Sequence, residues 1–323
     1  MKNMELARGA KTVVELNAGV KPGEKVLILT DTGIEESIAE ALAAAAKAAE
    51  AEVTVMITSP GKKPGEEPNP LVAAAMSAAD VIISPTTRTI YHTDAATRAL
   101  ENGGRIVTLT EITEKILISG GIEADFVGLQ PRVAYAKELF EKGGKVHVTT
   151  EAGTDLTLDM TGRCCTACTG LCEPGQKIGI PELEVFVAPL EGTTNGTLVV
   201  DACSSGIGLM ENPMVLKIEN GKVVSIEGGK EADRLKSILK DSGDENSYNI
   251  AEFAIGLNDR AKVIGDIIED EGVYGTGHFA VGNNVHFGGV NYAPIHLDMV
   301  YFHPTIEIDG KIIMEKGVLV GEV

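Results

Sequence analysis

The sequence predicts a two-domain protein. The first domain is α/β, with a doubly wound parallel sheet. The second is mainly β, with an α+β or barrel-like fold, and carries a metal site. Three observations lead to this fold class. Candidate strands and Ala-rich helices alternate in the first part of the chain, the later part changes to short strands and turns, and histidines gather near the C-terminus. We expect the α/β domain over residues 1–130 and the metal-binding catalytic domain over residues 131–323, with the boundary between Glu123 and Lys145.

The alternating part contains four apolar runs typical of buried strands, separated by segments of helical composition. The expected strands are residues 25–30, 51–57, 80–84 and 105–109, and the expected helices are residues 35–49, 70–78 and 92–100. This order is typical of a parallel sheet with helical crossovers. The turn at residues 30–34 carries no G-x-G-x-x-G, and the sequence contains no G-x-x-x-x-G-K-[ST], so we expect no nucleotide cofactor.

From about residue 145 the sequence is rich in short β-like runs and turn signals. Asn220-Gly221 and Asp309-Gly310 each stand between such runs and predict tight hairpins, because both turn positions favour positive φ. Helical patterning returns only in residues 230–239 and 259–269. These features predict an α+β or barrel-like second domain.

The charge composition of the chain limits which classes of partner it can bind. The 323 residues include 28 basic and 47 acidic side chains, for a net charge of −19, which repels phosphate backbones and anionic lipids. Nucleic acid and membrane partners are therefore not expected. The first residues contain no apolar run of signal-peptide length, and we expect a cytoplasmic protein.

Four of the five cysteines fall within nine residues and include one C-x-x-C step; they are Cys164, Cys165, Cys168 and Cys172. This spacing allows a zinc or iron–sulfur site. A structural zinc site usually draws on two separated pairs, and Cys203 stands alone. We therefore favour small buried thiols that pack around a turn.

The six histidines are unevenly spread, with four of them in residues 278–303. In a strand at residues 295–300, His296 and Asp298 would project from the same face and offer an imidazole and a carboxylate to one ion. His278 lies beside glycines, which allow close approach of a ligand. An isolated H-x-D is common by chance, and a histidine beside glycines is more often a surface or hydrogen-bonded residue than a ligand. Their concentration indicates a metal site.

Four blocks of the later part resemble the metallo-aminopeptidases of the aminopeptidase T and S family, often called leucyl aminopeptidases. They are PELEVFVAP at residues 181–189, EFAIGLN at 252–258, GTGHFAVG at 275–282 and HLD at 296–298. The resemblance covers residue 154 to the C-terminus, and the alternating first part is compatible with the family's N-terminal α/β domain.

The resemblance implies a metal-dependent aminopeptidase-like hydrolase that releases N-terminal residues from small peptides and forms a homodimer. The family's two-metal ligands fall on Glu184, Glu252, His278, His296 and Asp298. This donor set suits two zinc, cobalt or manganese ions. Paired ions would hold a water as hydroxide, with the catalytic Glu184 or Glu252 bridging the ions or accepting the proton.

Two positions depart from the family pattern: Val285 replaces a tyrosine of the site, and Leu183 replaces a glycine. The same superfamily includes iron(II) ring-cleaving dioxygenases that act on dihydroxypyridines, and His278, His296 and Asp298 would form their 2-His-1-carboxylate triad. A non-catalytic protein that binds a small molecule or metal is a third alternative. We favour the hydrolase, because two further carboxylates are superfluous around one iron.

Overall fold

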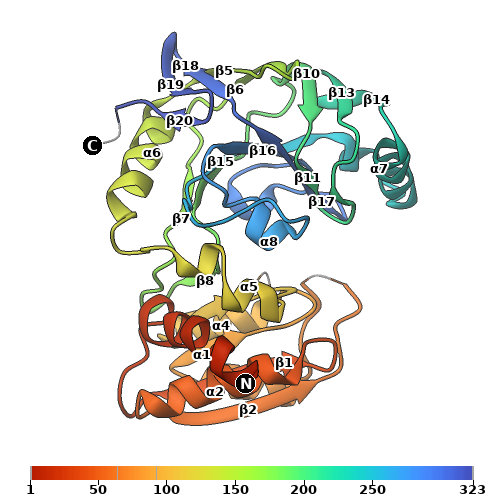
Figure 1. Cartoon of the computed structure of the whole chain (residues 1–323). Helices are drawn as coiled ribbons and strands as arrows, with labels where there is room; N and C mark the ends of the chain where they lie inside the picture. Colours follow the sequence, from red (N-terminus) through yellow and green to blue (C-terminus); the bar gives the residue numbers. More distant parts are fainter. Residues whose placement is uncertain (1, 64, 92, 322–323) are drawn as a thin grey trace. The chain divides into compact units, whose positions relative to one another are not determined.

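The computed structural model describes residues 2–63, 65–91 and 93–321 (Figure 1). The chain divides into two compact units. The first comprises Met1–Gly128 and Thr169–Glu182, and the second comprises Leu129–Cys168 and Leu183–Val323. None of the helices in the described part of the chain combines the length and apolar character needed to cross a bilayer.

The first unit is built on a parallel sheet whose strands, within the described residues, follow the order β2-β1-β3-β4-β8. The strands are β1 (Lys25–Asp31), β2 (Glu52–Thr58), β3 (Val81–Ser84), β4 (Arg105–Thr108) and β8 (Lys177–Gly179). The helical segments are α1 (Lys2–Lys11), the π-helical η1 (Thr12–Asn17), α2 (Glu36–Ala48), α3 (Pro70–Ala78), α4 (Asp94–Glu101), α5 (Glu114–Ile118) and η2 (Gly121–Glu123).

Helices cover both faces of this sheet. α3 and α4 pack on the face that carries Leu27, Leu29 and Ile82, whereas α1, α2 and α5 contact one another. Side-chain caps fix the N-termini of α3 and α4. The Asn69 side chain accepts from two amides of α3, and the Thr93 hydroxyl accepts from one amide of α4. The predicted doubly wound parallel sheet is confirmed. His92, expected to begin the helix at residues 92–100, lies outside the described residues, and the N-terminal helical segments and β8 were not anticipated.

The second unit contains two antiparallel sheets in its described part. The first has the order β14-β13-β10-β6-β5-β18-β19-β20, and the second has the order β12-β11-β17-β16-β15-β9-β7. The strands are β5 (Lys145–Thr149), β6 (Asp155–Asp159), β7 (Thr166–Cys168), β9 (Glu184–Val187), β10 (Asn195–Val200), β11 (Cys203–Ser204), β12 (Gly208–Leu209), β13 (Met214–Glu219), β14 (Lys222–Glu227), β15 (Ile250–Gly256), β16 (Thr276–Gly282), β17 (His296–Phe302), β18 (Thr305–Ile308), β19 (Lys311–Glu315) and β20 (Val318–Leu319). The mainly β second domain is confirmed.

Both predicted hairpin turns are present. Asn220 and Gly221 join β13 to β14 with φ of 50° and 77°, and Asp309 and Gly310 join β18 to β19 with φ of 50° and 81°. Two consecutive positive φ values match the right-handed twist of the paired strands, which is why Asn-Gly and Asp-Gly are favoured here.

The helical segments of the second unit are α6 (Gln130–Lys142), α7 (Lys230–Asp241), η3 (Glu245–Tyr248), α8 (Ile267–Asp270) and η4 (Val285–Phe287). The predicted helix at residues 230–239 is confirmed as α7, and α6 was not anticipated. The helix predicted at residues 259–269 is wrong in most of its length. The Asn258 side chain accepts from the amides of Arg260 and Ala261, and this local turn replaces the helical hydrogen bonds until α8.

One face of the β15-β16-β17 sheet is sealed by aromatic packing. Phe253, Phe279 and Tyr301 are fully buried on neighbouring strands, with ring centroids 5.2 and 5.7 Å apart, and Phe140 of α6 stacks on Phe253 at 5.3 Å. Alternate residues of the same strands point to the other face. That other face carries the polar cluster described next.

Candidate metal centre

Four neighbouring strands of the second unit, β17, β16, β15 and β9, bring together the five predicted site residues. Glu184 begins β9, Glu252 lies on β15, His278 lies on β16, and His296 and Asp298 lie on β17. Residues more than a hundred positions apart meet here because the strands are hydrogen-bonded side by side.

The register explains how the acidic groups fit on one face. Glu252 lies opposite Ala280, and Ala280 in turn lies opposite Asp298, so a small side chain separates two carboxylates across three strands. His296 lies opposite Gly282, which carries no side chain. Small residues on the central strand therefore leave room between the flanking carboxylates and imidazoles.

The Nε2 atoms of both imidazoles face carboxylate oxygens. His296 Nε2 lies 3.2 Å from both Glu252 Oε2 and Asp298 Oδ1. His278 Nε2 lies 3.5 Å from Glu184 Oε2 and 3.6 Å from Glu252 Oε1. Glu184, Glu252 and His278 are almost fully buried, whereas the His296 side chain is 31% exposed, so the cluster opens on the His296 side.

Surrounding groups orient these side chains. His296 Nδ1 lies 2.8 Å from the Asn283 carbonyl, so Nδ1 donates and Nε2 is directed to the carboxylates. The Ser205 hydroxyl donates to Asp298 Oδ2 and accepts from the Asp298 amide, both at 3.1 Å. The Cys168 thiol donates to Glu184 Oε1 at 3.7 Å. This is the kind of outer support that metal-ligating side chains have.

The charges shift the titration of the cluster. Burial disfavours the imidazolium of His278, but the Glu252 and Glu184 carboxylates outweigh it and raise the His278 pKa to about 9. The pKa of His296 is likewise raised well above its ordinary value, chiefly by Asp298 against burial. Burial alone would raise the Asp298 pKa, yet His296 lowers it to about 2. The cluster thus attracts positive charge.

Two sets of side chains that lie wholly within the described residues of the second unit can hold a cation. Glu252, His296 and Asp298 each offer a ligand atom within 4.8 Å of the others, and so do Glu271, His278 and Asp298. Glu271 follows α8 and was missed by the sequence reasoning, as was Ser205. Neither has a local signal, because Glu271 ends an acidic run and Ser205 stands in a plain Ser-Ser-Gly turn.

The other two histidines of residues 278–303, His286 and His303, are exposed. Val285, at the position of the family tyrosine, is 38% exposed. The Tyr274 hydroxyl accepts from the Leu319 amide, and Tyr292 is 67% exposed.

The clustered cysteines separate in the structure. Cys172 belongs to the segment of the first unit, where its thiol contacts the Ile106 carbonyl, whereas Cys164, Cys165 and Cys168 belong to the second unit. Burial raises the pKa of both Cys165 and Cys172 to about 11, which disfavours the thiolate that metals need. The packing role stays a prediction.

The fold and the cluster define a two-unit protein with a carboxylate–imidazole centre on an antiparallel sheet. The family model described as 2,5-dihydroxypyridine 5,6-dioxygenase matches residues 6–321, and the chain belongs to this family. A curated relative, 2,5-dihydroxypyridine 5,6-dioxygenase of Pseudomonas putida KT2440, is 28% identical over 256 residues, which cover 75% of this chain and 71% of that protein.

Two solved structures share the fold. The structure of the dihydroxypyridine dioxygenase from Pseudomonas putida KT2440 matches with a TM-score of 0.83 and 23% identity, over 99% of this chain and 98% of that one. Wild-type AmpT from Thermus thermophilus matches with a TM-score of 0.69 and 18% identity, over 99% of this chain and all of that one. The expected link between the two groups is supported at the level of fold.

The family match corrects the functional prediction. The aminopeptidase, protease and hydrolase assignments are wrong, because the family and the curated relative are dioxygenases. The error has a physical origin. Carboxylates and imidazoles serve hydrolytic and oxygen-activating metals alike, and we counted every carboxylate as a metal ligand.

Proposed function

We propose that this protein is an iron(II)-dependent dioxygenase that opens the ring of a dihydroxypyridine. The observation that carries the proposal is the family match over residues 6–321. The named activity of the Pseudomonas putida relative supports the same substrate class. A buried centre with two imidazoles fits this chemistry, because non-haem iron oxygenases commonly use two histidines and one carboxylate.

We assign the iron ligands to His278, His296 and Asp298, in the domain expected over residues 131–323. Two features of the cluster fit a cation. Three carboxylates face two imidazoles, so negative charge remains even when both rings are protonated. His278 Nδ1 is buried and has no hydrogen-bond partner in the described part of the chain. A buried polar atom of this kind is costly unless a ligand occupies it.

When bound, ferrous iron would supply the one-electron chemistry that lets dioxygen react with an electron-rich ring. The overall reaction balances without a further reductant. One ring carbon–carbon bond breaks, and both atoms of O₂ enter the opened product. The protein must therefore bind the ring, take up or release protons and keep bulk water out.

Glu252 is the side chain placed to handle the substrate proton. It is 5% exposed and faces both imidazoles, which outweigh burial and lower its pKa, so it is an available base. In our proposal Glu252 accepts the proton that a ring hydroxyl loses on binding. Glu184 accepts a hydrogen bond from the Cys168 thiol and balances the charge of His278.

The decisive experiment supplies iron and the ring compound. Protein loaded with Fe(II) under nitrogen should consume one O₂ for each 2,5-dihydroxypyridine on admission of air, and ¹⁸O₂ should label the product twice. A leucyl amide should remain uncleaved. Absence of oxygen uptake by protein with stoichiometric iron would contradict the proposal. The apoprotein and zinc-loaded protein serve as inactive controls.

We also propose, as the sequence analysis expects, that the protein is cytoplasmic and forms a homodimer. Sedimentation equilibrium of the purified chain tests the dimer. A mass of twice 33.9 kDa is the expected result.

A further inference from the structure

The loop between β16 and β17, residues 283–295, contacts the candidate ligand His296 in two ways. The Asn283 carbonyl lies 2.8 Å from His296 Nδ1, and the Phe287 ring stands edge-on to the imidazole with centroids 5.8 Å apart. Phe287 also stands edge-on to Phe186 of β9 at 5.3 Å. Phe186 and Phe287 are half-buried, so both keep surface that a ligand can cover.

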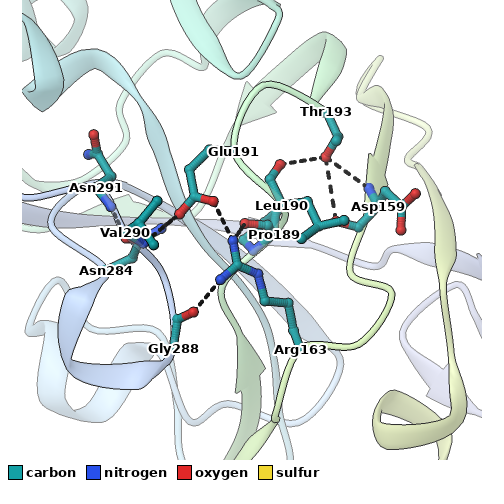
Figure 2. Close-up of polar contacts among 10 residues, drawn as sticks. All are labelled: Asp159, Arg163, Pro189, Leu190, Glu191, Thr193, Asn284, Gly288, Val290 and Asn291. Atoms are coloured by element: carbon teal, nitrogen blue, oxygen red, sulfur yellow. Dashed lines mark hydrogen bonds and ion pairs between the residues drawn. The ribbon is translucent and has the colours of Figure 1, made fainter.

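Two charged residues from outside the loop contact it at Asn284, Gly288 and Val290. Glu191 Oε1 accepts from the Asn284 side chain at 3.1 Å and from the Val290 amide at 2.8 Å. Glu191 Oε2 pairs with the guanidinium of Arg163, which also donates to the Gly288 carbonyl. Figure 2 shows the contacts of the Arg163 and Glu191 side chains with Asn284, Gly288 and Val290 of the loop.

The loop is also closed internally. Asn284 is fully buried, and its Oδ1 accepts from the Asn291 amide at 2.8 Å. A Cβ atom at Gly289 would lie 2.0 Å from the Asn284 side chain, so only glycine fits there. Hence Glu191 contacts a loop of defined shape, and the same loop carries Phe287.

The Arg163 and Glu191 side chains are only 13% and 27% exposed, and removing both from water is costly. Such a pair adds little net stability but fixes geometry, since planar guanidinium and carboxylate groups bond in few orientations. The geometry fixed here is that of the loop beside the candidate metal centre.

We propose that Glu191 and Arg163 are positioning residues that hold the 283–295 loop so that Phe287 and Phe186 form an aromatic wall for a planar ring beside His296. This inference rests on the proposed function for the identity of the ring. The anchoring of the loop itself does not depend on it. Aromatic rings favour offset or edge contacts with other rings, so such a wall suits a pyridine better than an aliphatic chain.

The anchoring is tested by hydrogen exchange of the apoprotein, which needs neither metal nor substrate. Glu191→Gln keeps the side-chain size but has one oxygen, so it cannot serve both Arg163 and the Val290 amide. We expect faster exchange in the peptide spanning residues 284–292. Glu151→Gln, which removes the exposed pair of Glu151 with Lys316 in the same unit, is the matched control. Exchange in residues 284–292 equal to that of the control would overturn the anchoring.

The wall is tested by substrate binding to iron-loaded protein under nitrogen. Phe287→Leu should weaken the affinity for 2,5-dihydroxypyridine by about two- to tenfold, while loop exchange and iron content stay unchanged. Glu191→Gln should weaken the affinity similarly, and steady-state assays should show the loss in KM more than in kcat. Arg163→Lys keeps the positive charge, and its affinity for 2,5-dihydroxypyridine should lie between that of Glu191→Gln and that of the wild type.

The outcomes separate the two proposals. Wild-type affinity in Phe287→Leu, or in a Glu191→Gln variant with a loosened loop, would overturn the wall. If the iron-loaded wild type neither binds nor oxidises 2,5-dihydroxypyridine, both the proposed function and the aromatic wall for this ring are contradicted. Loop exchange would still decide the anchoring.

Discussion

The two units each bury a charged cluster, and the clusters differ in whether their hydrogen-bonding groups are all used. In the first unit, Arg105 donates to the Ala18 and Gly19 carbonyls and to both oxygens of Glu24. One positive charge meets one negative charge. In the second unit, three carboxylates surround two imidazoles at 3.2–3.6 Å. The first cluster is complete by itself, whereas the second calls for a cation.

This difference teaches how a structural charge is told from a functional one. Burial alone does not distinguish them, since the Arg105 side chain is 5% exposed and the Glu252 side chain is 7% exposed. What distinguishes them is the balance of charge and the unfilled imidazole nitrogen of His278. Substitutions in the first cluster should therefore change stability, and substitutions in the second should change metal binding.

The largest effect is expected from loss of a ligand in the second cluster. Asp298→Ala and His296→Ala should each weaken Fe(II) binding by at least about 100-fold, because a first ligand contributes more than the supporting contacts whose loss costs about 10- to 100-fold. Calorimetric titration under nitrogen measures the affinity, and circular dichroism checks the fold. His303→Ala, at an exposed histidine, is the control. Wild-type affinity in both variants would refute the ligand assignment.

Arg105→Met should destabilise the protein by about 3 kcal/mol, because it leaves the Glu24 carboxylate without its partner and frees two backbone carbonyls. Urea unfolding measures the loss, while iron affinity should not change. Arg88→Met, which breaks the exposed pair with Glu111, should cost less than about 1 kcal/mol. Equal losses in the two variants would remove the contrast between buried and exposed pairs.

A smaller effect is expected from Ser205→Ala, which removes the hydrogen bond to Asp298 Oδ2 but no ligand atom. Iron affinity should fall by about tenfold, and loss of the bond from the Asp298 amide should lower the unfolding free energy by about 1 kcal/mol. Ser237→Ala on the exposed surface of α7 is the matched control. If Ser205→Ala binds iron like Ser237→Ala, the serine does not orient the carboxylate.

The smallest effect concerns the pH dependence of the first cluster. Burial opposes ionisation of Glu24, but Arg105 outweighs it and lowers the pKa of this carboxyl. A lowered pKa contributes stability above the unfolded value of about 4.3, and this stability is lost as pH falls through the folded pKa. Glu24→Gln should therefore be about 1 kcal/mol less stable than the wild type at pH 7 and equal to it in acid. A difference that persists at pH 2.5 would contradict the linkage.

The local elements follow from the sequence because their signals are local. The run at residues 25–30 forms β1, the alanines of residues 35–49 form α2, and the Asn220-Gly221 turn joins two strands, each within a few residues of the prediction. The helix predicted at residues 259–269 failed because the Asn258 side chain competes for backbone amides. Apolar periodicity does not report such competition.

Only part of the candidate metal centre could be predicted from the sequence. Alternation along one strand suffices to place His296 and Asp298 on the same face. Glu184 and Glu252 were named from the family resemblance alone, and Glu271 and Ser205 were not named at all. Their proximity depends on the pairing of β9, β15, β16 and β17, which no local pattern encodes.

The sequence by itself determined the α/β character of the first domain, the mainly β character of the second, the hairpin turns and the chemical type of the metal centre. Each of these depends on residue identity and short-range periodicity. Only the tertiary structure decided that segment 169–182 joins the first unit through β8, that Ala280 leaves room between Glu252 and Asp298, and that Arg163 and Glu191 anchor the loop beside His296. These features depend on contacts between residues far apart in the chain. Many sequences satisfy the same local preferences, and only the packed sheets select which distant side chains meet.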